Sequence, residues 1–154
     1  MSMGATVIYD SRMFEVDGAL RDVCVLDASE DDWSRVIARL CLHSSETHFS
    51  TTLPQLPVDL KRNAGELFSI LASNAEESAT FSAKVGTVWF SCHFFQSSEI
   101  EFTFDPTDVE SADSFRCVVD FMSEVGEACG KRVVMTMESN DHRHIPALLE
   151  WIPE

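Results

Sequence analysis

Basic residues are scarce in this sequence. Eleven lysines and arginines stand against 26 aspartates and glutamates in 154 residues, which gives a formal net charge of −15. A surface with this excess of carboxylates repels nucleic acids and anionic membranes, and it attracts basic molecules. We therefore expect neither a nucleic-acid partner nor a membrane partner, and we expect a basic protein partner instead.

Long hydrophobic runs are also missing. No stretch approaches the roughly 20 apolar residues of a membrane-spanning helix, and the opening residues MSMGATVIYDSR have no basic segment typical of a secretory signal. The five cysteines form no CxxC pair and most lie in apolar patterns, so we interpret them as reduced, buried thiols. These features together predict a cytoplasmic location.

The sequence contains none of the common catalytic motifs. The sequence has only six glycines, and none falls in the spacing of a P-loop or of a GxGxxG turn. Neither a GxSxG elbow nor an HExxH pair occurs. The sequence therefore predicts no catalytic residue, no metal site and no cofactor.

Apolar residues, in contrast, are plentiful. They make up 45% of the chain and include eleven phenylalanines, so the acidic excess does not reflect disorder. The length and this content predict a single domain over residues 1–154 with one packed core.

The pattern along the first half predicts strands followed by helices. We expect a short strand around Thr6–Tyr9 and then a hairpin, with strands at Met13–Val16 and Ala19–Leu26 around an Asp-Gly turn. The run at the end of the second strand is apolar on both sides, so it is predicted to be covered on both faces or central. Ser29 and Asp32 form a capping box that opens a helix.

A polar segment separates the first helix from the second. Residues His43–Leu56 are rich in Ser and Thr without a period, which indicates a loop, and Pro57 is expected at the first position of the second helix.

The second half predicts three strands, a helix and a final strand. Thr87–Phe95 carries large side chains on both faces, which favours a central strand, whereas the next strand places Glu99, Glu101 and Thr103 on a water-facing side. A helix over Ala112–Cys129 should end at Gly130, and Trp151 should dock onto the body. The order predicts an α+β fold, with a mainly antiparallel sheet of five to six strands and about three helices packed on one side.

Two groups of carboxylates are candidate partner-binding residues. Glu99 and Glu101 share a strand face, and the predicted third helix carries a carboxylate row opposite its apolar stripe: Asp113, Asp120, Glu124 and Glu127. A solvated face would explain such a row, but surfaces built only for solubility usually mix both signs of charge. One-signed surfaces are what electrostatic steering of a basic partner uses.

The histidines and paired acids suggest little chemistry. Cys92 and His93 point to opposite faces of a strand, so His93 is interpreted as half-buried and hydrogen-bonded. Asp141, His142 and His144 resemble metal ligands but are predicted to form a solvated loop. Nothing in the sequence suggests burial of Glu99 or Glu101, so these two carboxyls are not expected to act as an acid–base pair.

The C-terminal half resembles a known class of proteins. The stretch CHFFQSSEIEFTFDP (Cys92–Pro106) is followed by Phe121-Met122, Gly126, Gly130-Lys131, Thr136 and Glu138. This pattern is similar to small uncharacterised bacterial proteins, some of which are regarded as immunity proteins of polymorphic toxin systems. The resemblance implies an antitoxin that blocks a toxin by binding it, and it assigns no functional residue.

These observations lead to a functional hypothesis. We expect a non-enzymatic, cytoplasmic binding protein, an acidic inhibitor or immunity protein that neutralises a basic partner such as a toxin. One alternative function is a secretion chaperone or adaptor. Another is a small enzyme whose site assembles from scattered residues such as His93, Glu101 and Asp105. The sequence is also compatible with a homodimer.

Overall fold

The fold is built on one sheet of seven strands. The computed structural model describes residues 9–55 and 58–153, and in them the strand order is β2-β3-β4-β5-β1-β6-β7 with every neighbouring pair antiparallel. The strands are β1 (Arg21–Leu26), β2 (Glu46–Thr51), β3 (Ala79–Val85), β4 (Val88–His93), β5 (Glu99–Phe104), β6 (Val133–Met137) and β7 (Leu149–Trp151). The predicted α+β class is confirmed, with slightly more strands than expected.

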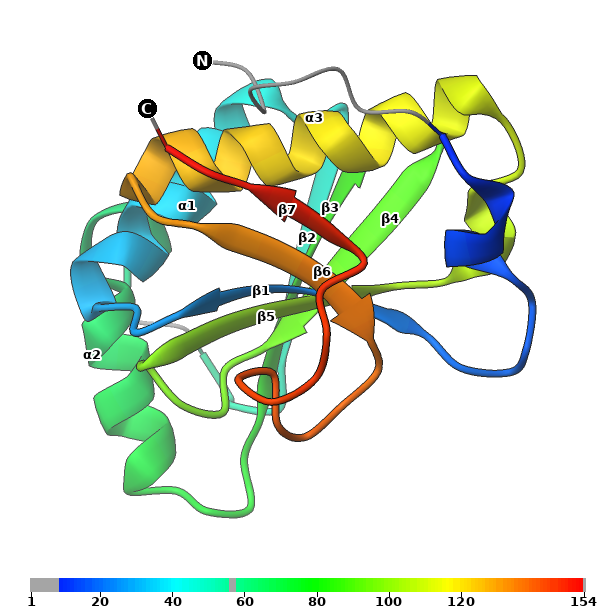
Figure 1. Cartoon of the computed structure of the whole chain (residues 1–154). Helices are drawn as coiled ribbons and strands as arrows, with labels where there is room; N and C mark the ends of the chain where they lie inside the picture. Colours follow the sequence, from blue (N-terminus) through cyan, green and yellow to red (C-terminus); the bar gives the residue numbers. More distant parts are fainter. Residues whose placement is uncertain (1–8, 56–57, 154) are drawn as a thin grey trace.

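The helices leave one face of this sheet uncovered. The three α-helices among the described residues are α1 (Glu30–His43), α2 (Leu60–Ala72) and α3 (Ala112–Cys129). Figure 1 shows α1 and α3 against one face, with α2 beside α1, while the loop that joins β6 to β7 reaches the opposite face. We call this opposite face the open face.

The helix ends follow the sequence signals. Ser29 caps α1 and exchanges hydrogen bonds with Asp32 in the predicted capping box. The third helix has the predicted bounds, and Gly130 ends it with a φ of +65°, a left-handed conformation that glycine adopts without strain.

The core lies between the sheet and the helices. Phe90 of β4 stacks on Phe121 of α3, with ring centroids 3.8 Å apart, and Phe102 of β5 meets the same ring edge-on. Trp33 of α1 packs against Phe94 just after β4. These contacts bury the side of each strand that faces the helices, which leaves the alternate side chains for the open face.

The N-terminal hairpin prediction is wrong. Residues Ser11–Phe14 form a short 3-10 helix, η1, capped by Asp10, rather than a strand, and only β1 of the expected pair exists. The turn chemistry was correctly located, because Gly18 has a φ of +85°. The expected strand at Thr6–Tyr9 lies mostly outside the described residues, and Tyr9 itself is not in a strand.

The predicted loop at His43–Leu56 is also wrong in part, because it contains β2. This strand lies at the sheet edge and pairs only with β3 among the described strands. Its side chains alternate between exposed and half-buried, and none is fully buried. The second helix begins at Leu60 after the cap Asp59, and Pro57 lies outside the described residues.

The C-terminal segment completes the sheet. Trp151 of β7 is buried, as expected, and its ring packs directly on Gly126 of α3. In the part of the chain that the structure describes, no helix has the length and apolar character needed to cross a membrane.

Candidate functional site

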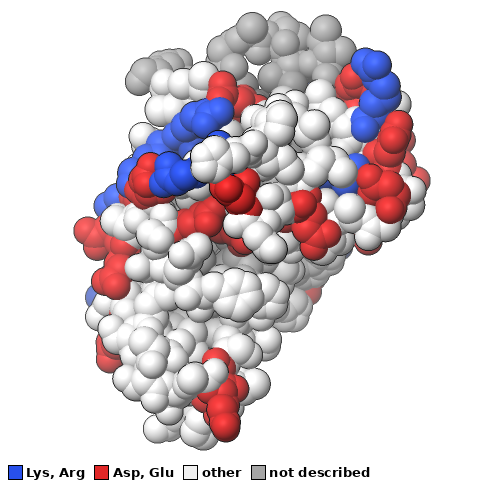
Figure 2. Space-filling model, turned by 60° about the horizontal axis from the view of Figure 1, so that its bottom comes forward, with Lys and Arg blue, Asp and Glu red and all other residues white. Residues whose placement is uncertain are grey.

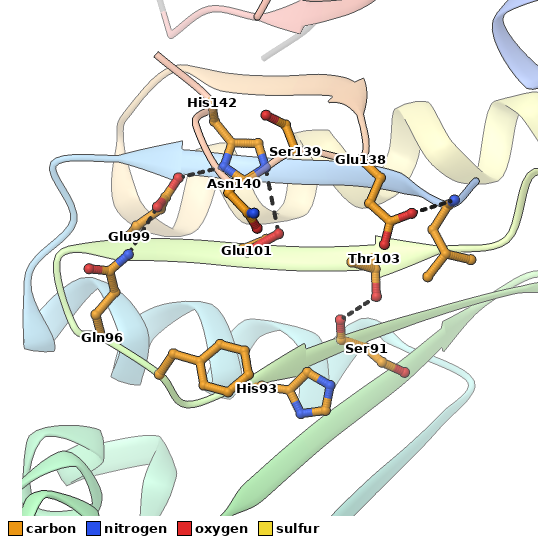
Figure 3. A pocket seen from close by; sticks show the side chains of 12 residues that line it. Ser91, His93, Gln96, Glu99, Glu101, Thr103, Glu138, Ser139, Asn140 and His142 are labelled. Atoms are coloured by element: carbon orange, nitrogen blue, oxygen red, sulfur yellow. Dashed lines mark hydrogen bonds and ion pairs between the residues drawn. The ribbon is translucent and has the colours of Figure 1, made fainter. Parts of the chain in front are cut away.

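A polar pocket opens on the open face of the sheet. Its volume is about 400 Å³, and its lining comes from β4, β5 and the connection between them, from the chain after β6, and from the residue before β1: Leu20, Ser91, His93, Phe95, Gln96, Glu99, Glu101, Thr103, Glu138, Ser139, Asn140 and His142. Figure 3 shows these side chains converging from the two strands and the loop. Three glutamates line this acidic pocket, and neither Lys nor Arg is among its lining residues.

The floor of the acidic pocket follows from strand register. Antiparallel pairing places Cys24 of β1 opposite Glu101 of β5, and Asp22 opposite Thr103. These side chains alternate with the core residues Val23 and Phe102, so they point to the open face. The prediction that β1 is covered on both faces or central is confirmed, because Asp22 and Cys24 are as buried as their core neighbours and β1 lies between β5 and β6.

His142 covers this floor from above. Its Nδ1 atom lies 2.8 Å from Glu99 Oε1, and its Nε2 atom lies 2.8 Å from Asp22 Oδ2 and 3.5 Å from Glu101 Oε1. The backbone N–H of Ser139 also donates to Asp22 Oδ2, at 3.1 Å. His142 is therefore only 6% exposed, which corrects the prediction of a solvated loop at this residue.

The rest of that loop matches the prediction. His144 and Asp141 are exposed and form an ion pair with each other, 2.7 Å apart. The sequence pattern grouped the wrong residues, since His142 joins residues of two strands rather than its loop neighbours.

Burial and crowded carboxylates change the acidity of the site. Burial, together with the nearby Asp22 carboxylate, raises the pKa of Glu101 to about 7. Burial alone would lower the pKa of His142, but the hydrogen bond to Asp22 and the charges of Glu101 and Asp22 raise it above its ordinary value. The expectation that Glu101 sits in an ordinary solvated setting is therefore wrong.

Two groups of potential metal ligands overlap at His142. Asp22, Glu101 and His142 each offer an atom within 4.8 Å of the others, and so do Cys24, Glu99 and His142. In the second group the Cys24 thiol donates to Glu99 Oε1 at 3.1 Å. In the first group Asp22 is fully buried, and its Oδ1 atom has no hydrogen-bond partner.

Aromatic side chains border one side of the acidic pocket. The rings of His93 and Phe95 stack with centroids 5.2 Å apart, and Phe95 is 78% exposed. His93 is itself exposed rather than half-buried, although its Nδ1 lies 3.0 Å from the Thr80 hydroxyl as a hydrogen-bond partner. The pocket therefore combines carboxylates with an accessible aromatic shelf.

The candidate partner-binding residues do not form one surface. Glu99 and Glu101 lie in the acidic pocket, whereas Asp113, Asp120, Glu124 and Glu127 lie on α3, which covers the other face of the sheet. Figure 2 shows carboxylates in several separate groups on the visible side of the molecule.

Part of the carboxylate row on α3 is already paired. Arg39 of α1 lies 2.7 Å from Glu124 and 3.5 Å from Glu127, and His43 also contacts Glu124 at 2.9 Å. Asp113 and Asp120 are exposed. Helix packing thus uses two of the four carboxylates that the sequence suggested for a partner.

The scattered enzyme site assembles only in part. His93 and Glu101 both line the acidic pocket, but Asp105 caps the short 3-10 helix η2 (Pro106–Asp108) and is not among the lining residues. Sequence reasoning missed Asp22 and Glu138, and it named His142 but placed it in a solvated loop. The signal for Asp22 was its place in a strand predicted to be covered on both faces.

Comparisons with known proteins give little further assignment. The chain matches no family model and no curated protein. One solved structure to which this chain shows some similarity is the 1.75 Å crystal structure of the toxic C-terminal tip of CdiA from Pseudomonas aeruginosa in complex with immune protein. The match has a TM-score of 0.48 and 10% identity, and it covers 86% of this chain and 94% of that chain. Similarity at this level assigns neither a family nor a function.

Proposed function

We propose that this chain is a non-enzymatic inhibitor of the immunity type, which binds a basic partner protein and receives a Lys or Arg side chain of that partner in the acidic pocket. The single observation that carries the proposal is the lining of the pocket, with Glu99, Glu101 and Glu138 and without Lys or Arg. A cationic side chain would relieve the repulsion among these carboxylates.

The border of the pocket suits the same occupant. A guanidinium stacks well on an aromatic ring, and aromatic and Arg side chains dominate the binding energy of many protein interfaces. Phe95 and His93 provide such rings beside the glutamates. The open antiparallel sheet gives a partner a broad surface around the pocket.

The whole-chain charge supports the kind of partner. A net charge of −15 accelerates encounter with a basic protein and slows encounter with acidic ones. The resemblance of the C-terminal half to immunity-type proteins points to the same class, in which the partner is a toxin.

The test uses the product of the gene next to this one as the candidate partner. Co-expression should restore growth that this product alone inhibits, and the two proteins should purify as a complex. Glu138→Lys should weaken both effects, because Glu138 is an exposed residue of the pocket wall that can change without disturbing the buried floor.

Asp120→Lys on α3 is the matched control, because it makes the same charge change on the other face of the sheet. It should leave rescue and complex formation intact. If Asp120→Lys disrupts the complex and Glu138→Lys does not, the binding surface lies on α3. If neither protein affects the other, the inhibitor proposal fails.

A second candidate is an enzyme that uses the same pocket. The observation in its favour is Glu101, whose pKa is raised to about 7 in a concave site beside His142. If the chain is an enzyme, Glu101→Gln should abolish the rescue of growth although the complex with the partner still forms. If it is an inhibitor, a variant that still forms the complex should also still rescue growth.

A further inference from the structure

Three potential ligand atoms lie close together at the floor of the acidic pocket. They are His142 Nε2, Asp22 Oδ2 and Glu101 Oε1, with the histidine atom 2.8 Å and 3.5 Å from the two oxygens. If Nδ1–H donates to Glu99, Nε2 of the neutral ring presents a lone pair to both carboxylates. This arrangement needs a positive charge at its centre, either a proton or a metal ion.

From these residues we propose a divalent transition-metal site, with Asp22, Glu101 and His142 as ligands and with Zn²⁺ or Mn²⁺ as the cation. The inference goes beyond the proposed function and does not depend on it. One imidazole and two carboxylates are a donor set that suits these ions.

The two separations measured from His142 Nε2 fit one shared ion. Donor atoms that are each about 2.1 Å from an ion lie about 3.0 Å apart in octahedral geometry and about 3.4 Å apart in tetrahedral geometry. The observed 2.8 Å and 3.5 Å lie close to these values. The third pair, Asp22 and Glu101, lies within 4.8 Å.

A second observation concerns the Asp22 carboxylate. Asp22 is fully buried, yet its Oδ1 atom has no hydrogen-bond partner. An unpartnered carboxylate oxygen in the interior is costly. A cation beside this carboxylate would remove that cost.

Glu99 is the outer hydrogen-bond partner that a metal-bound histidine usually has. It accepts from His142 Nδ1 at 2.8 Å, which fixes the ring with Nε2 toward the other two ligands. Glu99 Oε1 also accepts from the Cys24 thiol. The group Cys24, Glu99 and His142 is thus a hydrogen-bonded chain whose atoms already have partners, and we assign it the positioning role.

The site keeps access to solvent. Glu101 and His142 line the acidic pocket of about 400 Å³, so an ion with three protein ligands has coordination positions open to water or to a donor group of a partner. Glu138 stays outside the ligand set, which keeps the metal site and the charge test of the proposed function separate.

The test is isothermal titration calorimetry of the whole chain. A chelator first removes any bound metal, and the chain is then titrated with ZnCl₂ and, separately, with MnCl₂. Wild type should bind one equivalent. Glu101→Gln should weaken binding by more than about 100-fold, beyond the usual cost of losing an outer-shell partner, and Glu99→Gln should weaken it by about 10-fold or more. Asp22→Asn should also lose the ion.

Two controls separate the site from other metal-binding groups. His144→Ala should bind Zn²⁺ as wild type does, and so should Asp141→Asn, because each removes only the exposed Asp141–His144 pair. Bound Mn²⁺ should broaden the imidazole resonances of His142 in the NMR spectrum. Absence of binding, or binding that survives Glu101→Gln or is lost in His144→Ala, would overturn the proposal.

Discussion

The guanidinium of Arg21 is almost completely buried and holds the segment before β1 in place. It is 1% exposed and donates to the carbonyl oxygens of Met13 at 2.8 Å and Glu15 at 3.0 Å, and also to those of Ala19 and Leu20. One side chain therefore satisfies several carbonyls of an irregular segment, which explains how that segment folds without a strand partner.

Replacing Arg21 with Lys should destabilise the fold although the charge is kept. A single ammonium lacks the planar fork that reaches these carbonyls, so we expect the free energy of unfolding to fall by about 2–4 kcal/mol. Urea denaturation measures this. Arg12→Lys is the matched control, because Arg12 is exposed and pairs only locally with Asp10. An equal loss in both variants would contradict the anchoring role of Arg21.

At the pocket floor, the sequence predicted the direction of some side chains but not how much of each is buried. Strand alternation correctly placed Glu99 and Glu101 away from the core. It did not predict their burial, because the cover is His142, and the contact of His142 with Asp22 joins residues 120 positions apart. Local patterns carry no information about such contacts.

At the scale of elements, Asp32 at the start of α1 is also buried, but its pKa is shifted in the opposite direction to that of Glu101. Burial alone would raise its pKa, but hydrogen bonds from Lys131, from the Ser29 N–H and from Arg35 lower it below the ordinary value of 3.8. Lys131 and Arg35 each lie 2.6 Å from its carboxylate. Asp32 thus links the N-terminus of α1 to the segment that follows α3.

Asp32→Asn should therefore lower the free energy of unfolding at pH 7 by about 1–2 kcal/mol, the usual scale of a lost helix cap. Because the folded-state pKa is depressed, the advantage of wild type is fully present above the ordinary pKa and disappears as the pH falls through the folded-state value. Urea denaturation of both proteins from pH 7 to pH 3 measures the difference. A difference that grows toward low pH would contradict this assignment.

Two helical glycines should respond in opposite ways to alanine. A Cβ atom at Gly126 would lie 2.2 Å from the buried ring of Trp151, whereas at Gly65 the nearest atom, at 2.3 Å, is the carboxylate end of the exposed Glu30 side chain. Alanine gains up to about 1 kcal/mol of helix propensity over glycine. At Gly126 we expect overpacking to outweigh this gain by about 1–3 kcal/mol, because the core ring cannot move aside.

Thermal unfolding followed by tryptophan fluorescence measures this pair. Gly126→Ala should lower the melting temperature, whereas Gly65→Ala should leave it unchanged or raise it. Tolerance of both substitutions would show that β7 is not held against α3 as described.

The elements that the sequence predicted are those with a strong apolar period. The bounds of α3 and the capping box of α1 were predicted because their signals are local. The edge strand β2 was missed because pairing with β3, rather than any apolar alternation, defines it. The strand expected at Met13–Val16 gave way to η1, which Arg21 and Asp10 hold through backbone contacts.

At the scale of the whole molecule, the acidic excess is spread over both faces of the sheet. The sequence predicted the charge and offered both Glu99 and Glu101 and the row on α3 as partner-binding residues, but it did not show that Arg39 pairs with Glu124 and Glu127. Sequence spacing places residues on a face of their own element, and it does not place those faces relative to one another. We therefore propose that a partner contacts the acidic pocket rather than α3.

The most direct measurement is the association rate constant of the chain with its partner, determined by surface plasmon resonance at several salt concentrations. Glu138→Lys should slow association by roughly tenfold at low salt and reduce its salt dependence, because it reverses the charge at the pocket. Asp120→Lys should have a clearly smaller effect. Equal slowing by both variants, or slowing by Asp120→Lys alone, would contradict the claim that a basic partner is received in the acidic pocket.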